Sequence, residues 1–178
     1  DISEAFHDVC DALREAVQGD GVVLDGELIA MDEEGVPRLH RVMERWHQGK
    51  LATKPVPVSF EVFDILYRDG ELLMGEPLHR RKAHLNSTVE QNALIHVCHY
   101  EEGEGVALFQ AAQELGLEGI VAKDRASVYQ PGKRSRHWLK IKATKTANLI
   151  VGGYTIGEGK KKELFGSVML GAYDKKRL

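Results

Sequence analysis

The sequence predicts an α+β fold, and three features lead to this prediction. Segments with apolar residues at the 3.6-residue period of a helix are interspersed with short segments rich in Val, Ile, Phe and Tyr. Most of the short segments are joined by turns that contain Gly, Asp or Pro, as in hairpins of antiparallel strands. Strands and helices do not alternate one for one, as they would in a doubly wound parallel sheet. We therefore expect mostly antiparallel sheets with flanking helices.

The spacing of apolar residues and the positions of turn residues predict each helix and strand along the chain. Phe6, Val9 and Leu13 lie on one stripe of the first expected helix, and Trp46 belongs to the stripe of the second, so we expect Trp46 in the core. Gly116 ends the last helix as a C-cap. The expected helices cover residues 3–17, 39–47, 78–85 and 106–115. The expected strands cover residues 22–31, 36–39, 56–67, 93–100, 120–122, 138–142, 149–155 and 165–173.

The composition is that of an ordinary globular protein. The 178 residues allow one good-sized domain, or one domain and part of another. No apolar run approaches the roughly 20 residues that cross a bilayer, and the first residues lack the pattern of a signal peptide. We expect a cytoplasmic protein in which Cys10 and Cys98 are buried free thiols. The histidines show no metal-site spacing, which argues against a zinc protein.

Charge is distributed unevenly along the chain. Residues 123–178 hold 14 Lys and Arg against 4 Asp and Glu, whereas residues 1–122 hold 10 against 23. A basic C-terminal third favours a polyanionic partner. The alternative is a solvated surface without a partner. The basic residues at 133–137 and 160–162 are the candidates for contacts with a nucleic-acid phosphate backbone.

Two lysines on one expected strand form the first candidate site. Residues two apart in a strand share a face, so Lys140 and Lys142 point the same way in W-L-K-I-K. Two neighbouring ammonium groups favour an anion between them, and a phosphate suits this arrangement. The alternative is an edge strand that lysines guard against aggregation.

Carboxylates and one aromatic ring complete the candidate set. Glu118 enters an apolar strand near these cations and is a candidate Mg²⁺ ligand, or simply a solvated strand start. Lys123 lies five residues later, so it shares a surface with Glu118 only if the strand is irregular at Gly119. Glu27 is able to accept hydrogen bonds from a ribose, and Phe63 is able to stack on a base, although a strand Phe is usually core.

The order of four segments is more specific than any one of them. L-D-G-E-L, F-E-V-F-D-I-L-Y, L-E-G-I-V-A-K and W-L-K-I-K follow one another in the chain. The series resembles the nucleotidyltransferase motifs of ATP-dependent DNA ligases, most closely the bacterial ligase modules, including those of end joining. Residues 149–155 and 164–174 resemble the opening strands of that family's OB-fold domain. The resemblance implies an ATP-grasp-like adenylation domain over residues 1–144, followed by the beginning of an OB-fold β-barrel over residues 145–178.

The resemblance implies a reaction and its participants. In such ligases a lysine attacks the α-phosphate of ATP, the adenylate passes to a 5′-phosphate at a nick in double-stranded DNA, and a 3′-hydroxyl then displaces AMP. By similarity, Glu118 binds the divalent metal, Mg²⁺ or Mn²⁺, and Lys140 and Lys142 hold the α-phosphate. These three residues are the implied catalytic groups.

The remaining implied contacts are with the nucleoside. By similarity, Glu27 contacts the ribose and Phe63 stacks on adenine. Lys123 matches the lysine that ends the motif E-G-x-x-x-K and is carried over as a nucleotide-binding residue.

The chain departs from the family pattern at its nucleophile. The motif K-x-D-G is absent, because Gln18, Val23 and Tyr67 stand where the three D-G pairs of the chain would need a lysine. We expect the motif to precede Asp1. The 34 residues after Thr144 are also too few for the five strands of an OB-fold. The chain is thus interpreted as truncated at both ends, unable to adenylylate itself, and able to self-associate through exposed strand edges.

Two other interpretations stay open at this point. An RNA ligase or an mRNA capping enzyme uses the same kind of pocket. A non-catalytic nucleic-acid-binding module would keep the basic surface but not the reaction.

Overall fold

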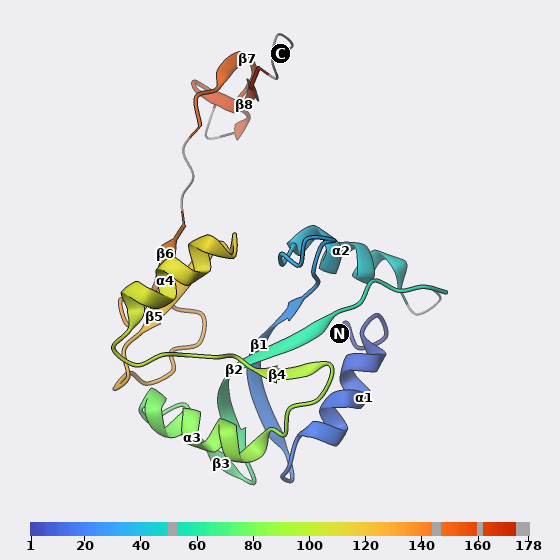
Figure 1. Ribbon diagram of the computed structural model, residues 1–178, viewed down its shortest axis with the longest axis vertical. Coiled ribbons are helices and arrows are strands. Elements are labelled where there is room, and N and C mark those ends of the chain that lie inside the picture. Colours follow the sequence, from blue (N-terminus) through green and yellow to red (C-terminus); the bar gives the residue numbers. More distant parts are fainter. Residues whose placement is uncertain (50–52, 144–146, 160–161, 174–178) are drawn as a thin grey trace. The chain divides into compact units, whose positions relative to one another are not determined.

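The computed structural model describes residues 1–49, 53–143, 147–159 and 162–173, which form two compact units, Asp1–Ala143 and Thr144–Leu178 (Figure 1). In chain order the helices are α1 His7–Ala16, α2 Leu39–Gln48, α3 Leu78–Thr88 and α4 Gly105–Glu114. The strands are β1 Val22–Ile29, β2 Ser59–Arg68, β3 Glu71–Leu72, β4 Ile95–Val97, β5 Gly119–Lys123, β6 Trp138–Lys142, β7 Ile150–Ile156 and β8 Phe165–Gly171.

The largest sheet is built around β2. This strand pairs antiparallel with β1 and with the short β3, and parallel with β4. The register of β1 against β2 shifts between Asp25 and Gly26, which leaves Phe63 as an extra residue between the paired Val62 and Asp64. Gly26 is required here, because a Cβ at this position would lie 2.6 Å from the Phe60 ring and 2.7 Å from a backbone oxygen.

The main core lies between this sheet and two helices. Val9 of α1 and Leu85 of α3 pack with Val62, Ile65 and Ile95 of the sheet, and all five are buried. The ends of α1 and α3 are also joined by backbone hydrogen bonds between residues 16–18 and 88–90. Figure 1 shows α1 and α3 flanking the strands of the large sheet. This packing makes a rigid frame for the residues that follow Val62 in β2.

The two-stranded sheet of β5 and β6 belongs to the same unit. The strands pair antiparallel in full register, and α4 packs against β5. Gly116 has a φ of 71° just after α4, as the predicted C-cap requires. The sequence prediction of an α+β fold with mostly antiparallel sheets and flanking helices is confirmed for the described residues.

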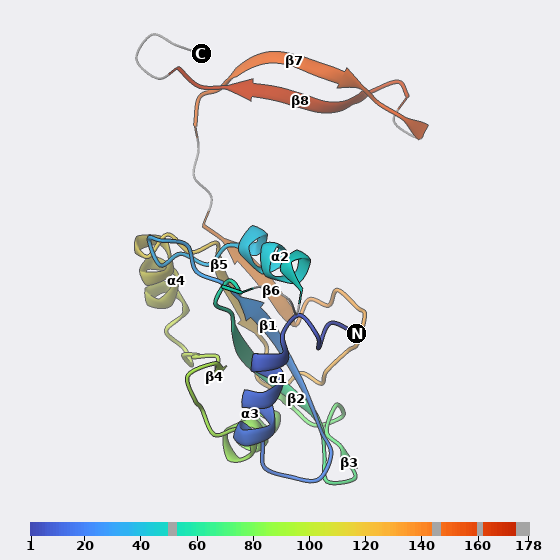
Figure 2. The ribbon, with the colours of Figure 1, turned by 90° about the vertical axis from the view of Figure 1, so that its right-hand side faces the viewer.

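The second unit is an antiparallel ribbon of β7 and β8 without a closed barrel among its described residues. Figure 2 shows β7 and β8 side by side as a two-stranded ribbon. Two strands cannot cover each other, so the ribbon exposes large apolar side chains such as Ile156, Phe165 and Met169. Its assignment as the beginning of an OB-fold stays a prediction.

Some expected elements are shorter in the structure. Residues 36–39 contribute a single bridge, Met31 with Pro37, instead of a strand, and the strand expected at 93–100 is reduced to β4. The placement of Trp46 in the core was wrong. In α2 it is Val42 and Arg45 that are buried, and Trp46 is 48% exposed. The reason is that Arg45 packs inward and donates to the backbone oxygens of Ala5 and Val56.

Two further expectations from the sequence concern the cysteines and membrane-spanning segments. Cys10 and Cys98 are free thiols as predicted, but both are half-buried rather than buried. Within the described ranges, none of the helices has the length and apolar character needed to cross a membrane.

Candidate functional site

One face of the β5–β6 sheet carries three lysines. Lys140 lies opposite Val121, Lys142 opposite Gly119 and Lys123 opposite Trp138. Directly opposite residues of an antiparallel pair point to the same side, as do residues two apart in one strand. Lys123, Lys140 and Lys142 therefore share a face.

Glu118 joins these lysines because β5 begins irregularly. Gly119 has a φ of 139°, and a Cβ there would lie 2.0 Å from the backbone oxygen of Ile141, so only glycine permits this close approach. The Glu118 carboxylate accepts a hydrogen bond from Lys140 Nζ at 2.5 Å. The hydrogen bond and the charge of Lys140 hold the pKa of Glu118 below its ordinary value. Of the two arrangements left open by the sequence, the irregular strand is the one observed.

A cavity of about 680 Å³ opens beside this face. Its lining residues come from β6 and from the preceding loop: Val128, Tyr129, Gln130, Gly132, Lys133, Arg134, Ser135, Trp138, Lys140 and Lys142. Four of the ten are cationic, and the described lining holds no carboxylate. The cavity is thus an electropositive hollow with two aromatic rings in its wall, which suits an anion that carries a flat ring.

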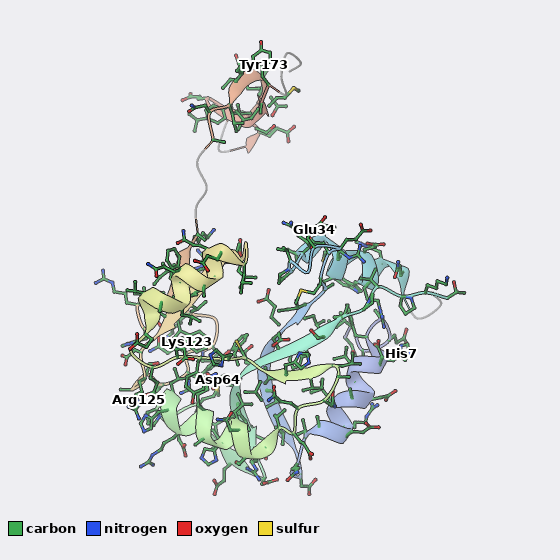
Figure 3. All side chains as sticks on the ribbon, viewed as in Figure 1. His7, Glu34, Asp64, Lys123, Arg125 and Tyr173 are labelled. Atoms are coloured by element: carbon green, nitrogen blue, oxygen red, sulfur yellow. The ribbon has the colours of Figure 1, made fainter. Side chains whose placement is uncertain are left out.

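Lys123 lies among aromatic rings behind this wall. Its ammonium is 3.7 Å from the centroid of the Trp138 ring and 4.3 Å from that of Phe63, and the two rings meet edge to face at 6.2 Å. Burial, followed by the positive charge of Lys82, lowers the pKa of Lys123 to about 8. Figure 3 shows Lys123 close to Asp64, whose charge acts in the opposite direction.

The loop between β5 and β6 is docked onto α3. Leu78 N donates to the oxygen of Ser127, and His79 N donates to the oxygen of Arg125. The first amides of a helix lack partners within the helix, and Pro77, the N-cap residue, provides no side-chain cap. The loop carbonyls therefore serve as the cap, and they hold the cavity wall at a fixed place against α3.

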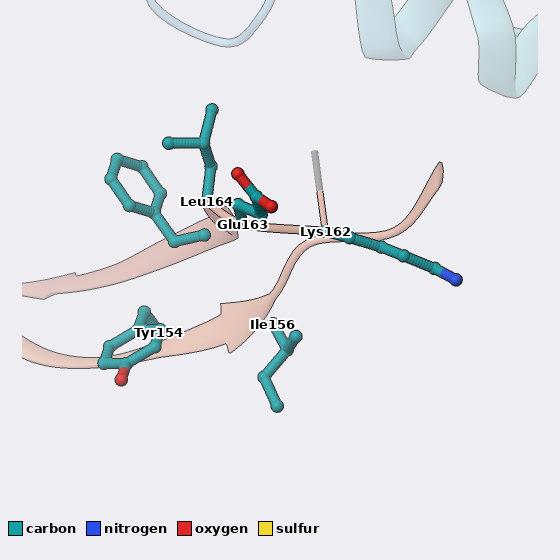
Figure 4. A pocket seen from close by; sticks show the side chains of 6 residues that line it. Tyr154, Ile156, Lys162, Glu163 and Leu164 are labelled. Atoms are coloured by element: carbon teal, nitrogen blue, oxygen red, sulfur yellow. The ribbon is translucent and has the colours of Figure 1, made fainter. Parts of the chain in front are cut away.

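A second hollow, of about 360 Å³, lies in the β7–β8 ribbon (Figure 4). Its walls are the side chains of Tyr154, Ile156, Lys162, Glu163, Leu164 and Phe165. One cation and one carboxylate offset each other there, so this hollow is less suited to a phosphate than the first.

The described residues contain no group of three or more His, Cys, Asp or Glu side chains placed to hold a metal ion. Glu118 provides one accessible carboxylate, 77% exposed, beside the lysines. Mg²⁺ commonly binds through one or two carboxylates, several waters and substrate phosphates. The site therefore fits a metal that arrives with a phosphorylated ligand better than a metal held by protein groups alone.

Comparison with known proteins identifies the family. Residues 1–142 match the family model described as the ATP dependent DNA ligase domain. The chain belongs to the ATP-dependent DNA ligase family. The recognition made from the four motifs is confirmed.

Individual ligases resemble the chain over most of its length. It is 34% identical over 185 residues to a DNA ligase of Thermococcus onnurineus, covering 97% of this chain and 32% of that protein. It is 34% identical over 160 residues to the multifunctional non-homologous end joining protein LigD of Mycobacterium bovis, covering 90% of this chain and 20% of that protein. The chain thus spans about a third or less of these relatives.

A solved ligase has the same fold. The structure of mycobacterial DNA ligase D complexed with ATP and MES superimposes with a TM-score of 0.61 at 29% identity, covering 95% of this chain and 50% of that one. The predicted adenylation-domain fold is consistent with this likeness.

The structure brings only some of the predicted site residues together. Lys140 and Lys142 line the cavity, Glu118 contacts Lys140, and Phe63 and Lys123 reach the cavity wall through Trp138. Glu27 is exposed on β1, opposite Glu61, and among the described residues its side chain has neither a hydrogen bond nor an ion pair.

Two residues of this candidate site, Trp138 and Arg81, did not emerge from sequence reasoning about chemistry. Trp138 is the first residue of the W-L-K-I-K motif, but the reasoning from that motif concerned only its two lysines. Asp64 and Arg81, both 0% exposed, form a bidentate pair at 2.8 and 2.9 Å beneath the cavity wall. An Arg in an expected helix and an Asp in an expected strand are separated by 17 residues, and local patterns carry no signal for such a contact.

Proposed function

We propose that this chain forms the ATP-binding part of a DNA ligase that seals nicks in double-stranded DNA. The observation that supports this best is the cavity of about 680 Å³ with Lys140 and Lys142 in one wall and Glu118 beside them. Phosphoryl and nucleotidyl transfer depend chiefly on cations positioned around the developing charge, rather than on an acid–base pair.

The catalytic contacts proposed are those of three side chains. Lys140 and Lys142 hold the α-phosphate of ATP, whose negative charge compensates the repulsion between the two ammonium groups. Glu118 binds the divalent ion, Mg²⁺ or Mn²⁺, that accompanies the phosphates. When bound, this ion supplies neutralisation of phosphate charge. Glu118 and Lys140 would exchange their mutual contact for contacts with the metal and the phosphate.

The nucleoside contacts proposed involve three other residues. Phe63 stacks on adenine, and Glu27 accepts hydrogen bonds from the ribose hydroxyls. Lys123 contacts the nucleotide near the base, since its ammonium already lies over the Phe63 ring. Stacking of adenine on that face of Phe63 requires the ammonium to move aside.

Nucleotide binding tests this proposal directly. We expect calorimetry to detect binding of ATP in the presence of Mg²⁺, and the substitution K140A combined with K142A to weaken it at least about tenfold through loss of two charge-assisted contacts. Lys54→Ala is the matched control, because Lys54 is an exposed lysine outside the cavity lining. Equal affinities for the wild type and the double variant would contradict the proposal.

We propose that this chain by itself does not form the covalent lysyl-adenylate from ATP. The sequence contains no K-x-D-G motif. We expect no acid-labile covalent label after incubation with radiolabelled ATP and Mg²⁺. A labelled band on this chain would show that another residue acts as the nucleophile.

DNA is proposed to contact the exposed basic residues of the β5–β6 loop, Lys133, Arg134 and Arg136. Lys162 is a further candidate, and Lys160 and Lys161 lie outside the described residues. Contacts with the phosphate backbone suit an enzyme that accepts any sequence. If three phosphates are neutralised, the logarithm of the binding constant falls with the logarithm of salt concentration at a slope of about −3. Affinity for a nicked duplex that does not change with salt would exclude this contact.

Three further proposals follow from the proposed function. Residues 1–144 form the adenylation domain and residues 145–178 the beginning of an OB-fold domain. The protein acts in the cytoplasm, at the nucleoid. The exposed apolar side chains of β7 and β8 favour self-association, which sedimentation at increasing protein concentration would detect as a rising mass.

A further inference from the structure

Tyr129 connects the cavity wall to the large sheet. Its hydroxyl donates a 2.6 Å hydrogen bond to Asp25 Oδ2 in β1, 104 residues away in sequence. Its backbone N donates to the oxygen of Met74 at 3.0 Å. Its ring meets the Trp138 ring edge to face at 5.8 Å. One side chain thus links the loop, β1 and β6.

The Tyr129 ring lies on a buried ion pair. The Arg81 guanidinium is 5.8 Å from the ring centroid and is held by both oxygens of Asp64. The same guanidinium donates to the backbone oxygens of Glu76 at 2.5 Å and Ser127 at 3.1 Å. Because Asp64 lies in β2 and Arg81 in α3, the ring rests on an ion pair that two elements of the main core hold in place.

The hydroxyl remains a donor over the whole working range of pH. Partial burial, together with the hydrogen bond to Asp25, raises the pKa of Tyr129 to about 12. Asp25 lies two residues before Glu27 in β1, and Tyr129 lines the cavity that Lys140 and Lys142 also line. The hydrogen bond therefore spans the gap between the strand of Glu27 and the strand of the two lysines.

We propose that Tyr129 and Asp25 are positioning residues of the nucleotide site: their hydrogen bond sets the distance between β1 and the β5–β6 loop and thereby the width of the cavity. This inference rests on the proposed function. Neither residue needs to touch the nucleotide. Without the bond, the loop is still tied to the frame by backbone contacts of residues 125–129 with α3 and Met74 and by the hydrogen bond from Arg81 to Ser127, but none of these contacts reaches β1.

The substitution Tyr129→Phe removes the hydroxyl and leaves the ring in place. We expect it to weaken ATP binding about tenfold in calorimetry, while the urea midpoint changes little. Amide hydrogen exchange should become faster in residues 128–137 and stay the same in β1 and β2. Tyr67→Phe is the matched control, since Tyr67 is also half-buried and its hydroxyl has no hydrogen bond among the described residues.

Variants at Asp25 make the test specific. Asp25→Asn keeps an acceptor oxygen and should retain more affinity than Asp25→Ala. Combining Asp25→Ala with Tyr129→Phe should cost no more than the larger single effect, because both remove the same bond.

The outcomes separate this inference from the proposed function. If the wild-type chain does not bind ATP, the proposed function fails. If the wild type binds ATP and Tyr129→Phe binds it equally well, the positioning role fails. A loss of binding that accompanies an equal loss of global stability in urea would assign Tyr129 to the core and overturn the inference as well.

Discussion

Two carboxylate–cation pairs lie in regions of opposite character. Asp64 and Arg81 are both 0% exposed between β2 and α3, and the guanidinium makes further hydrogen bonds to backbone oxygens. Glu118 and Lys140 form a single contact at the edge of the cavity, with side chains 77% and 51% exposed. A buried pair cannot lose one partner without leaving an uncompensated charge, whereas an exposed pair is easily replaced by water or ligand.

The difference in burial distinguishes a pair that supports the fold from a pair whose charged groups are available to bind a ligand. The buried pair holds the loop and Tyr129, and it has no freedom to exchange partners. The exposed pair keeps both of its charges accessible, so each is available to a metal ion or a phosphate. Four substitutions examine this contrast, and they follow in order of their expected effect on stability.

The largest loss of stability is expected for Asp64→Ala. It leaves Arg81 buried and without its carboxylate, which typically costs about 3–5 kcal/mol. Urea denaturation should show a much lower midpoint. Asp11→Ala is the control, because Asp11 pairs with Arg14 on the surface and its loss should change little. Equal midpoints for the two variants would mean that the buried pair contributes no more than a surface pair.

Gly119→Ala should have the next largest effect. The new methyl group would collide with the backbone oxygen of Ile141, and the φ of 139° disfavours any side chain. A strain of about 3 kcal/mol is expected, together with separation of Glu118 from Lys140. Denaturation and ATP calorimetry should both register it. Gly105→Ala, where a Cβ meets nothing within 4 Å, should be close to neutral in both measurements.

The pH dependence of stability should report on Lys123. Burial lowers its pKa from the ordinary value of 10.5 to about 8 in the folded chain. Between these values the unfolded chain binds one more proton, so stability should rise with pH over this window. Lys123→Met should flatten the rise in urea midpoints between pH 8 and pH 10.5, whereas Lys54→Met should not. A wild-type curve without this component would place the Lys123 ammonium in water.

Glu118→Gln should have the smallest effect on stability. The side chain is exposed and its contact with Lys140 is solvated, so the melting temperature should stay nearly the same. The part of ATP affinity that depends on Mg²⁺ should nevertheless fall, as calorimetry with and without the metal would measure. A large drop in melting temperature would instead make Glu118 a structural residue.

Local patterns were sufficient for most of the secondary structure and for the family. The alternation in W-L-K-I-K placed Lys140 and Lys142 on one face, and the run of L-E-G-I-V-A-K placed Lys123 and Glu118 near one strand. The helical pattern wrongly placed Trp46 in the core. An amphipathic stripe does not reveal that the Arg45 side chain is buried and donates to backbone oxygens. Strand lengths were overestimated where pairing partners are few, as in β4.

By itself the sequence determined the α+β class, the order of the motifs and the chemistry of their side chains, because these depend on residue type and short-range periodicity. Only the tertiary structure decided which of those side chains meet. The backbone contact at Gly119 brings Glu118 to Lys140, the bulge at Phe63 lets that ring meet Trp138, and the bond between Tyr129 and Asp25 joins segments 104 residues apart. Contacts of this kind arise from packing between distant segments, and no local pattern encodes them.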